Sequence, residues 1–426
     1  MDTRDCNTIA AWLAEAGLLG IRDEASLTQA FCERCVEAGL PLGKVFVMID
    51  TLHPMYEARA YFWDEGPENP FREEEYVGSR DPEGTAQWSR SPFLQMLRRR
   101  ETSLRCRLEH GETHGYSAIQ ELCDAGQTDY LAFVYRTRQA VRVEDVDAFY
   151  ARFTTARPGG FSDVDVACLA QLTPHLGLAI RSAAQTRLTK TLAEAYLGRD
   201  AGRRVLSGAI RHDAVRRIRA VLWYSDITGY THLSESVQAD QLIPLINDYA
   251  EAVIGAVKSA GGDVLKLIGD GVLAMFTSSR PEHACRAAID AEHDLRLRLG
   301  QLARRRKTEG LPVADIHLGL HAGDVFYGNI GTPDRLDFTV VGQAVNEVSR
   351  ISDMCHSTGR NMLCSSEFAD LLLGEERDKL VSVGRFALKG VGKAKELFTL
   401  DPSLAAAGTT PKKMTTSRRR ASVARP

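Results

Sequence analysis

The sequence lacks long hydrophobic runs and lacks a strong excess of charge of either sign. No apolar stretch approaches the ~20 residues that a membrane-spanning helix needs, so we expect no transmembrane segment. The 53 basic and 56 acidic residues give a formal charge of -3, which provides no general attraction to nucleic acid or to an anionic membrane. The first residues do not follow a signal-peptide pattern, so we expect a cytoplasmic location.

Cysteine is present but does not form a framework. The nine cysteines are odd in number and scattered, which argues against a secreted, disulfide-stapled protein. Cys32 and Cys35 form a CxxC pair within a stretch of helical periodicity, and no second pair at zinc-ligand spacing follows. We therefore expect these two thiols to be helix residues rather than a metal or redox centre.

The first part of the chain, residues 1–183, has the pattern of an α/β domain. Apolar residues recur three and four apart in two early segments, which predicts helices, and strand-like runs follow them. The predicted helices are 7–20 and 26–40, and the predicted strands are 44–54, 56–66 and 129–138. Nothing in this part has a catalytic pattern.

A long helix is predicted to leave this domain. It begins near residue 161 after a Ser/Asp cap signal and is expected to continue to residue 206. An apolar stripe at near-heptad spacing follows it: Leu172, Leu176, Ile180, Ala183, Leu188 and Leu192. The stripe suits a parallel two-helix connector between two chains, or a single helix that lies on its own domain. We assign residues 184–215 to this connector and to a short transducing element.

Residues 216–402 have the pattern of a second, α+β domain. Strand and helix signals follow the order β-α-β-β-α-β, which predicts a ferredoxin-like sheet with its helices on one face. Within this order, residues 316–331 are expected to form a strand hairpin. The remaining residues, 403–426, are rich in small and basic side chains, and we expect a disordered tail.

Two carboxylates of this second domain are expected to meet at one edge of the sheet. Asp226 follows a strand, and Asp270 stands in the tight "GDG" turn of the next hairpin. Two convergent carboxylates and a main-chain carbonyl, here that of Ile227, suit hard divalent cations, and two such ions can clamp an in-line displacement at phosphorus. Alternatively, Asp226 caps a turn and Asp270 simply favours an Asp-Gly turn.

Four segments of this domain, taken in order, resemble the class III nucleotidyl cyclases. They are "WYSDITGYTHLSE", "GGDVLKLIGDGVLAMF", "LDFTVVGQAVNEVSRI" and "FALKGVGKAKELFTL". The resemblance implies that Asp226, the Ile227 carbonyl and Asp270 hold two Mg²⁺ or Mn²⁺ ions. It further implies that Lys266 and Thr339 read the purine and that Asn346 orients the ribose. By the same resemblance, Arg350 stabilises the transition state and Lys389 contacts the triphosphate.

The residue types indicate the base. A lysine ammonium can donate to adenine N1, and the hydroxyl of Thr339 can accept from the exocyclic amino group. Guanine presents the opposite pattern, so Lys266 with Thr339 predicts ATP as substrate and 3′,5′-cyclic AMP and pyrophosphate as products. Alternatives are a guanylate cyclase of the same fold, a catalytically silent nucleotide-binding module, and a sensor whose output is partner binding through the tail.

The resemblance also implies an assembly. In this family the metal and purine residues come from one subunit, whereas the asparagine and arginine come from the other. A chain with the complete set is expected to form a homodimer with two shared active sites. The layout of residues 1–183 resembles GAF-like sensory domains, which predicts regulation by a stimulus that the sequence does not identify. No side chain stands out as the acceptor of the 3′-hydroxyl proton.

Overall fold

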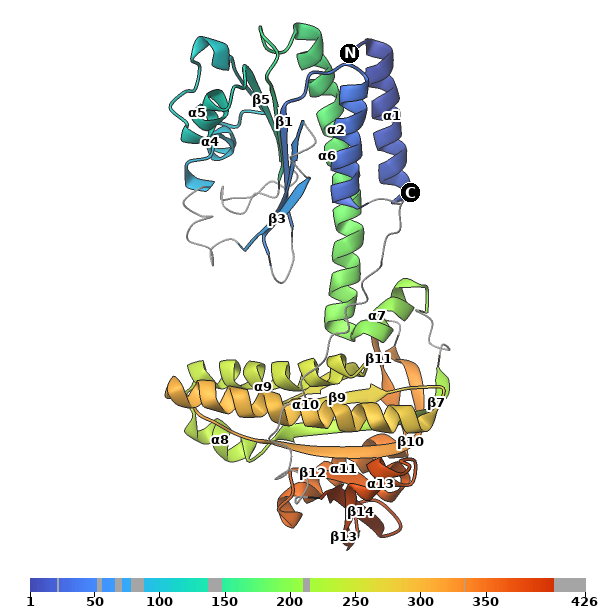
Figure 1. The fold of residues 1–426 in the computed structure, drawn as a ribbon. Helices are drawn as coiled ribbons and strands as arrows, with labels where there is room; N and C mark the ends of the chain where they lie inside the picture. Colours follow the sequence, from blue (N-terminus) through green and yellow to red (C-terminus); the bar gives the residue numbers. More distant parts are fainter. Residues whose placement is uncertain are drawn as a thin grey trace, which may run out of the picture. The chain divides into compact units, whose positions relative to one another are not determined.

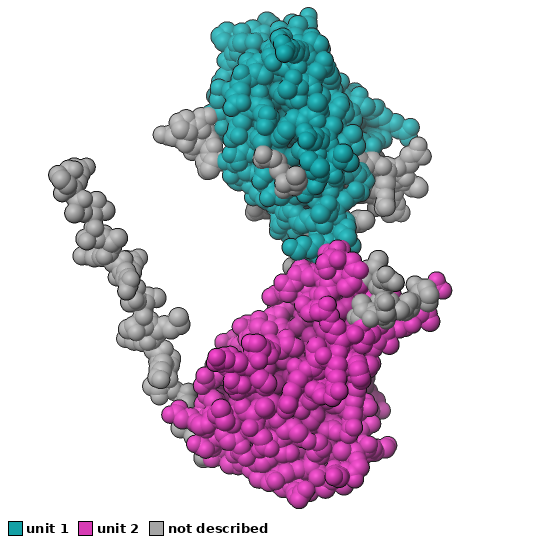
Figure 2. Space-filling model, turned by 90° about the vertical axis from the view of Figure 1, so that its right-hand side faces the viewer, with its two compact units in different colours: residues 1–192 teal, residues 193–426 magenta. Residues whose placement is uncertain are grey.

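The computed structural model describes residues 1–20, 23–51, 56–65, 71–77, 88–136, 148–209, 215–332 and 334–401. The chain divides into two compact units, Met1–Leu192 and Ala193–Pro426, which Figure 2 colours separately. The predicted disordered tail, 403–426, lies outside the described residues. None of the described helices combines the length and the apolar character that a membrane span requires.

Unit 1 is a mixed α/β structure around one antiparallel sheet (Figure 1). Its six strands lie in the order β3-β2-β1-β6-β5-β4. The strands are β1 Lys44–Asp50, β2 Ala58–Asp64, β3 Arg72–Tyr76, β4 Ser103–Cys106, β5 Asp129–Arg136 and β6 Ala148–Thr155. The helices are α1 Thr3–Leu19, α2 Glu24–Glu37, α4 Pro92–Arg99, the 3-10 turn η2 Leu108–His110, α5 Ser117–Asp124 and α6 Asp163–Leu197.

The two faces of this sheet are covered by different helices. Apolar residues of α1, α2 and α6 form one core with one face, and those of α4 and α5 form another core with the opposite face. Cys32 and Cys35 are fully buried in the first of these cores, and burial raises the pKa of both thiols, as expected for helix residues. The GAF-like character of this unit stays a prediction.

The long helix differs from the prediction at its end. α6 stops at Leu197, and a separate helix α7 runs from Arg199 to Leu206, so the expected continuous helix to residue 206 is wrong. Gly198 causes the break, because its φ of 88° is left-handed and a β-carbon there would lie 2.4 Å from the carbonyl oxygen of Val264. The chain therefore turns sharply where it reaches the second sheet.

The apolar stripe on α6 is largely internal to unit 1. Leu172, Leu176, Ile180 and Ala183 are buried in the core of that unit, as the single-helix alternative proposed. Leu188 and Leu192 are half-buried. The predicted contact between two chains through this helix therefore remains a prediction for its last turns alone.

Unit 2 is built around an eight-stranded sheet. The order is β13-β14-β12-β10-β7-β9-β8, with β11 paired to β10. The strands are β7 Arg216–Ile227, β8 Asp263–Ile268, β9 Gly271–Phe276, β10 Ile316–Thr332, β11 Arg335–Val341, β12 Met362–Ser365, β13 Leu380–Phe386 and β14 Lys395–Leu400. The helices are α7, α8 Tyr230–Ser236, α9 Ala239–Ser259, α10 Pro281–Thr308, α11 Gln343–Thr358, α12 Ser366–Ala369 and α13 Glu375–Asp378.

The β-α-β-β-α-β order is present as β7-α9-β8-β9-α10-β10, with antiparallel neighbours. The two helices of this order, α9 and α10, pack on one side of the sheet, as predicted. The helices α7 and α11, which lie outside the order, pack on the other side. One detail of the prediction is wrong: residues 316–331 do not form a hairpin, because β10 is one strand of 17 residues whose second half pairs with β11.

Two glycines bring α11 close to the sheet. A β-carbon at Gly319 would lie 2.5 Å from the carbonyl oxygen of Val348, and one at Gly323 would lie 2.7 Å from the β-carbon of Ala344. Larger residues at these positions of β10 would push the helix away. The close packing of α11 therefore fixes which residues of β7 lie beside the polar residues of this helix.

Candidate active site

The two predicted carboxylates meet at one end of the central strands. Asp226 is the penultimate residue of β7, and Asp270 stands in the turn between β8 and β9. The main-chain N–H of Ile227 donates to Oδ2 of Asp270 over 3.0 Å, which ties the turn to the end of β7. The structure thus brings Asp226 and Ile227 together with Asp270, which lies 43 positions after Ile227 in the sequence.

The electrostatics of this pair suit a cation. Burial, together with the charges of Asp270 and Asp353, raises the pKa of Asp226 to about 6, and burial also raises the pKa of Asp270. A divalent ion between the two would offset this unfavourable charge. Within the described residues, no three His, Cys, Asp or Glu side chains cluster as a metal site, so main-chain and substrate oxygens would have to complete the coordination.

Ser352 is a functional candidate that the sequence reasoning missed. Its hydroxyl donates to Oδ1 of Asp226 over 3.0 Å, and the residue is only 1% exposed. This hydrogen bond stabilises the ionised carboxylate and lowers the pKa of Asp226, against the larger effect of burial. Ser352 lies on α11, on the helix face that packs against β10. A polar residue at such a buried position was the one feature of the sequence that could have indicated this role.

Replacing Ser352 with alanine should weaken divalent-metal binding by about 10- to 100-fold, because the supporting partner of a metal-binding carboxylate is lost. The pKa of Asp226 should rise further, so protons should compete with the metal at higher pH than in the unmodified chain. Mn²⁺ titrations of the full chain between pH 5.5 and 8 measure both effects. Ser234→Ala is the control, because it removes a half-buried hydroxyl of α8 that bonds to the carbonyl of Thr231 and not to Asp226. Unchanged affinity and pH dependence would rule out this role for Ser352.

The predicted purine readers lie on two strands that do not pair with each other, β8 and β11. Lys266 is on β8, and its ammonium forms an ion pair with the carboxylate of Asp337 on β11. Thr339 stands two residues after Asp337 on the same strand, so both side chains face the same side of the sheet. The ion pair therefore brings the side of β11 that carries Thr339 close to Lys266.

Asp337 is a second residue that the sequence reasoning missed. Its carboxylate holds the ammonium of Lys266 although both side chains are about half exposed. The sequence offered one indication of this role. Asp337 comes two residues before Thr339 on a predicted strand, so the two side chains should lie on the same face. A carboxylate at this position orients the lysine and adds an acceptor next to the predicted base-binding groups.

Asn346 and Arg350 lie on the exposed side of α11, four residues apart, and so share one helix face. Arg350 pairs with Asp353 over 2.9 Å. In the part of the chain that the structure describes, no hydrogen bond or ion pair joins Asn346 or Arg350 to Asp226 or Asp270. Within one chain, these two residues therefore do not bond to the carboxylate pair.

Lys389 stands on the exposed loop between β13 and β14. Its neighbour Leu388 is buried, in a core with residues of α11, β12 and β14. This anchor fixes the base of the loop, while the ammonium of Lys389 faces solvent and is free to meet an anionic ligand.

Residues 215–401 match the family model of the adenylate and guanylate cyclase catalytic domain. This part of the chain is therefore a class III cyclase catalytic domain. An adenylate cyclase of Anabaena cylindrica is 34% identical over 145 residues, 34% of this chain and 29% of that protein. Adenylate cyclase 1 of Rhizobium meliloti is 26% identical over 209 residues, 48% of this chain and 30% of that protein. The chain thus matches less than a third of either relative's own length.

Solved cyclase structures are similar to parts of the chain. The adenylyl cyclase CyaB from P. aeruginosa has a TM-score of 0.40 at 25% identity, and the match covers 44% of this chain and 95% of that one. A bacterial light-regulated adenylyl cyclase has a TM-score of 0.46 at 19% identity, covering 60% and 82%. Together, the family match and the two adenylate cyclase relatives support the prediction that the chain is an adenylate cyclase enzyme.

Proposed function

We propose that the chain converts ATP to 3′,5′-cyclic AMP and pyrophosphate. The observation that carries this proposal is the convergence of Asp226 and Asp270 beside the end of β7, within a domain of the cyclase family. Two Mg²⁺ or Mn²⁺ ions held by these carboxylates and the Ile227 carbonyl would supply charge stabilisation at the phosphates and at the attacking hydroxyl. Lys389 adds a positive charge for the triphosphate.

Lys266, Thr339 and Asp337 select adenine in this proposal. The ammonium of Lys266 donates to N1, and the hydroxyl of Thr339 accepts from the exocyclic amino group. Asp337 keeps the ammonium on this side of β11 through the ion pair. Guanine would place the N1–H donor against the lysine ammonium, which cannot accept, and so would leave these two groups without a hydrogen bond.

We assign Asn346 and Arg350 to the other half of a shared site. Asn346 orients the ribose so that the 3′-oxygen lines up with the α-phosphorus, and the planar guanidinium of Arg350 neutralises charge on the phosphoryl oxygens. Both side chains are exposed and, among the described residues, make no bond to the carboxylate pair of their own chain, which supports a homodimer with two equivalent sites.

The first unit has a regulatory role in this proposal. α6 is one helix whose first part is buried in unit 1 and whose last turns belong to unit 2, so the chain joins the two units without a loop. A stimulus that changes how unit 1 holds α6 would be passed along this helix. Glu24 and Tyr61 both bond to Arg187 of α6 and are the contacts that such a change would alter.

Turnover of ATP and GTP by the full chain with Mn²⁺ or Mg²⁺ tests the substrate. Replacing Lys266 with methionine should lower kcat/KM for ATP by about 10- to 100-fold, because one charge-assisted hydrogen bond to the base is lost. Turnover of GTP should not fall in parallel, so the preference for ATP should collapse. Lys258→Met, an exposed lysine on α9, is the control. A chain that prefers GTP before any substitution would refute the assignment to adenylate cyclase.

A further inference from the structure

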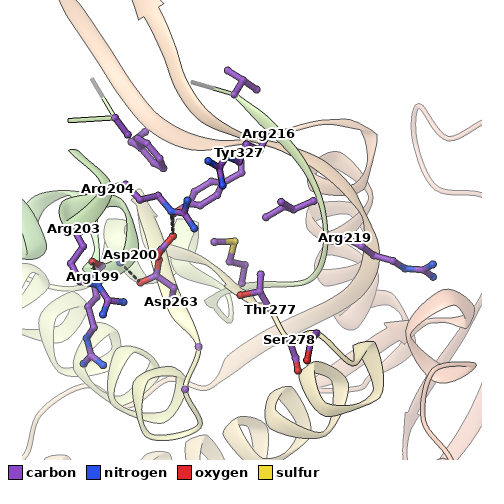
Figure 3. A pocket seen from close by; sticks show the side chains of 18 residues that line it. Arg199, Asp200, Arg203, Arg204, Arg216, Arg219, Asp263, Thr277, Ser278 and Tyr327 are labelled. Carbon is purple, nitrogen blue, oxygen red and sulfur yellow. Dashed lines mark hydrogen bonds and ion pairs between the residues drawn. The ribbon is translucent and has the colours of Figure 1, made fainter. Parts of the chain in front are cut away.

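A cavity of about 780 Å³ lies in unit 2, at the other end of β7 from the carboxylate pair (Figure 3). It is bordered by α7, the first residues of β7, the turn before β8, the end of β9 and Tyr327 of β10. Arg216 is the first residue of β7 and Asp226 is its penultimate residue. The ten strand positions between them correspond to about 30 Å. The cavity is therefore separate from the proposed active site.

Two arginines gather beside one aromatic ring in this cavity. Arg216 and Tyr327 are direct partners across β7 and β10, so their side chains lie on the same face of the sheet. The guanidinium of Arg204, from α7, lies over the same ring at 5.5 Å from its centre. Figure 3 shows Arg204 and Arg216 next to Tyr327. Planar guanidinium groups arranged like this suit a phosphate, which accepts two parallel hydrogen bonds.

The charges around the cavity leave an excess of positive charge. Asp200 accepts hydrogen bonds from Arg204 and from the Tyr327 hydroxyl, and so compensates one arginine. Arg216 makes no hydrogen bond or ion pair with any carboxylate of the described residues. Arg219 also borders the cavity, but it stands three positions after Arg216 on β7 and points to the opposite face of the sheet, away from Tyr327 (Figure 3). The other four arginines and the two aspartates of the lining give a net charge of +2. They are Arg199, Arg203, Arg204 and Arg216, with Asp200 and Asp263.

One buried acceptor in the lining also lacks a partner. Oδ1 of Asp263 accepts from the main-chain N–H of Asp200 over 3.4 Å, at the start of α7. Oδ2 of the same carboxylate is buried and has no hydrogen-bond partner among the described residues. A buried acceptor without a partner is unfavourable, so a ligand donor placed there would gain a hydrogen bond that the protein alone does not supply. Thr277 and Ser278 add hydroxyl groups, and Met275 and Phe338 add apolar surface.

We propose that this cavity binds a small molecule that carries both a phosphate group and a hydroxyl or amino donor. Arg204 and Arg216 bind the phosphate, and Oδ2 of Asp263 accepts from the donor. The ligand bridges α7 and the catalytic sheet, because Arg204 lies on the helix whereas Arg216 lies on β7. Its binding therefore holds α7 in place, at the point where the chain enters the catalytic domain.

Glycerol 3-phosphate is a suitable probe, because it combines a phosphate with hydroxyl donors and has no purine for the active site to recognise. Hydrogen–deuterium exchange of the full chain should slow in the peptides that cover α7 and the first residues of β7. Arg216→Gln should lower the affinity for the probe at least tenfold. Arg217→Gln should leave it unchanged, since Arg217 points to the opposite face and pairs with Asp324.

Asp263 is tested by comparing glycerol 3-phosphate with inorganic phosphate. Asp263→Asn should lower the ratio of the two affinities, because only the glycerol ester carries hydroxyl donors outside the phosphate group that the arginines hold. Protection confined to the peptides around Asp226 and Asp270 would assign the probe to the active site and overturn the proposal. A failure of both probes to protect α7 would also overturn the proposal. Protection of α7 that depends only on protein concentration would reflect binding of a second chain and would overturn it as well.

Discussion

Replacing Asp270 with alanine should lower the formation of cyclic AMP by at least about 10³-fold, because the metal-binding pair loses half of its charge and metal stabilisation is worth several kcal/mol. The fold should survive, since among the described residues the Asp270 side chain bonds to the N–H of Ile227 alone, at the end of β7. The assay uses the purified full chain with ATP and saturating Mn²⁺, with thermal unfolding measured alongside.

A matched substitution separates this effect from a general loss of acidic charge. Asp290 is an exposed aspartate on α10, away from the carboxylate pair, and Asp290→Ala should retain full activity. If Asp270→Ala kept more than a few per cent of the activity at saturating metal, Asp270 would be only a turn residue, as the simple Asp-Gly explanation states.

Replacing Arg350 with alanine should lower kcat by about 10²- to 10³-fold, the usual effect of removing one preorganised donor from a developing charge. Metal affinity should not change, because Arg350 lies on the exposed face of α11 and bonds to Asp353 rather than to Asp226. This combination, a low kcat with normal Mn²⁺ binding, distinguishes Arg350 from the carboxylates. Arg385→Ala, an exposed arginine of β13, serves as the comparison.

An equal loss of metal affinity and kcat in Arg350→Ala would contradict this assignment. It would mean that α11 had moved and that Ser352 no longer supported Asp226. The two residues are two positions apart on the same helix, so the Mn²⁺ titration is the decisive control for the kinetic result.

Much of the second unit could be predicted from its sequence, because local patterns there agree with the final fold. The alternation of strand and helix signals from residue 216 gives the β7-α9-β8-β9-α10-β10 order, and the motifs place Asp226 and Asp270 at one end of it. The length of β10 was not predictable from periodicity, since Gly319, Gly323 and Gly328 look like turn residues. Their role is different: two of them admit α11.

The missed features depend on contacts between distant segments. Ser352 contacts Asp226, 126 residues earlier, and Asp337 contacts Lys266, 71 residues earlier. The end of α6 is a similar case, because Gly198 breaks the helix where the carbonyl of Val264 approaches. Helical periodicity continues across that glycine, and only tertiary structure reveals the obstacle.

Mixing two inactive chains tests the central claim most directly, namely that unit 2 cyclises ATP in sites shared between two subunits. Asp226→Ala and Arg350→Ala chains should each be nearly inactive alone. After equal mixing and exchange of subunits, half of the dimers are mixed and each has one intact site, so about a quarter of the unmodified activity should return. Activity no greater than the sum of the two separate chains would contradict shared sites.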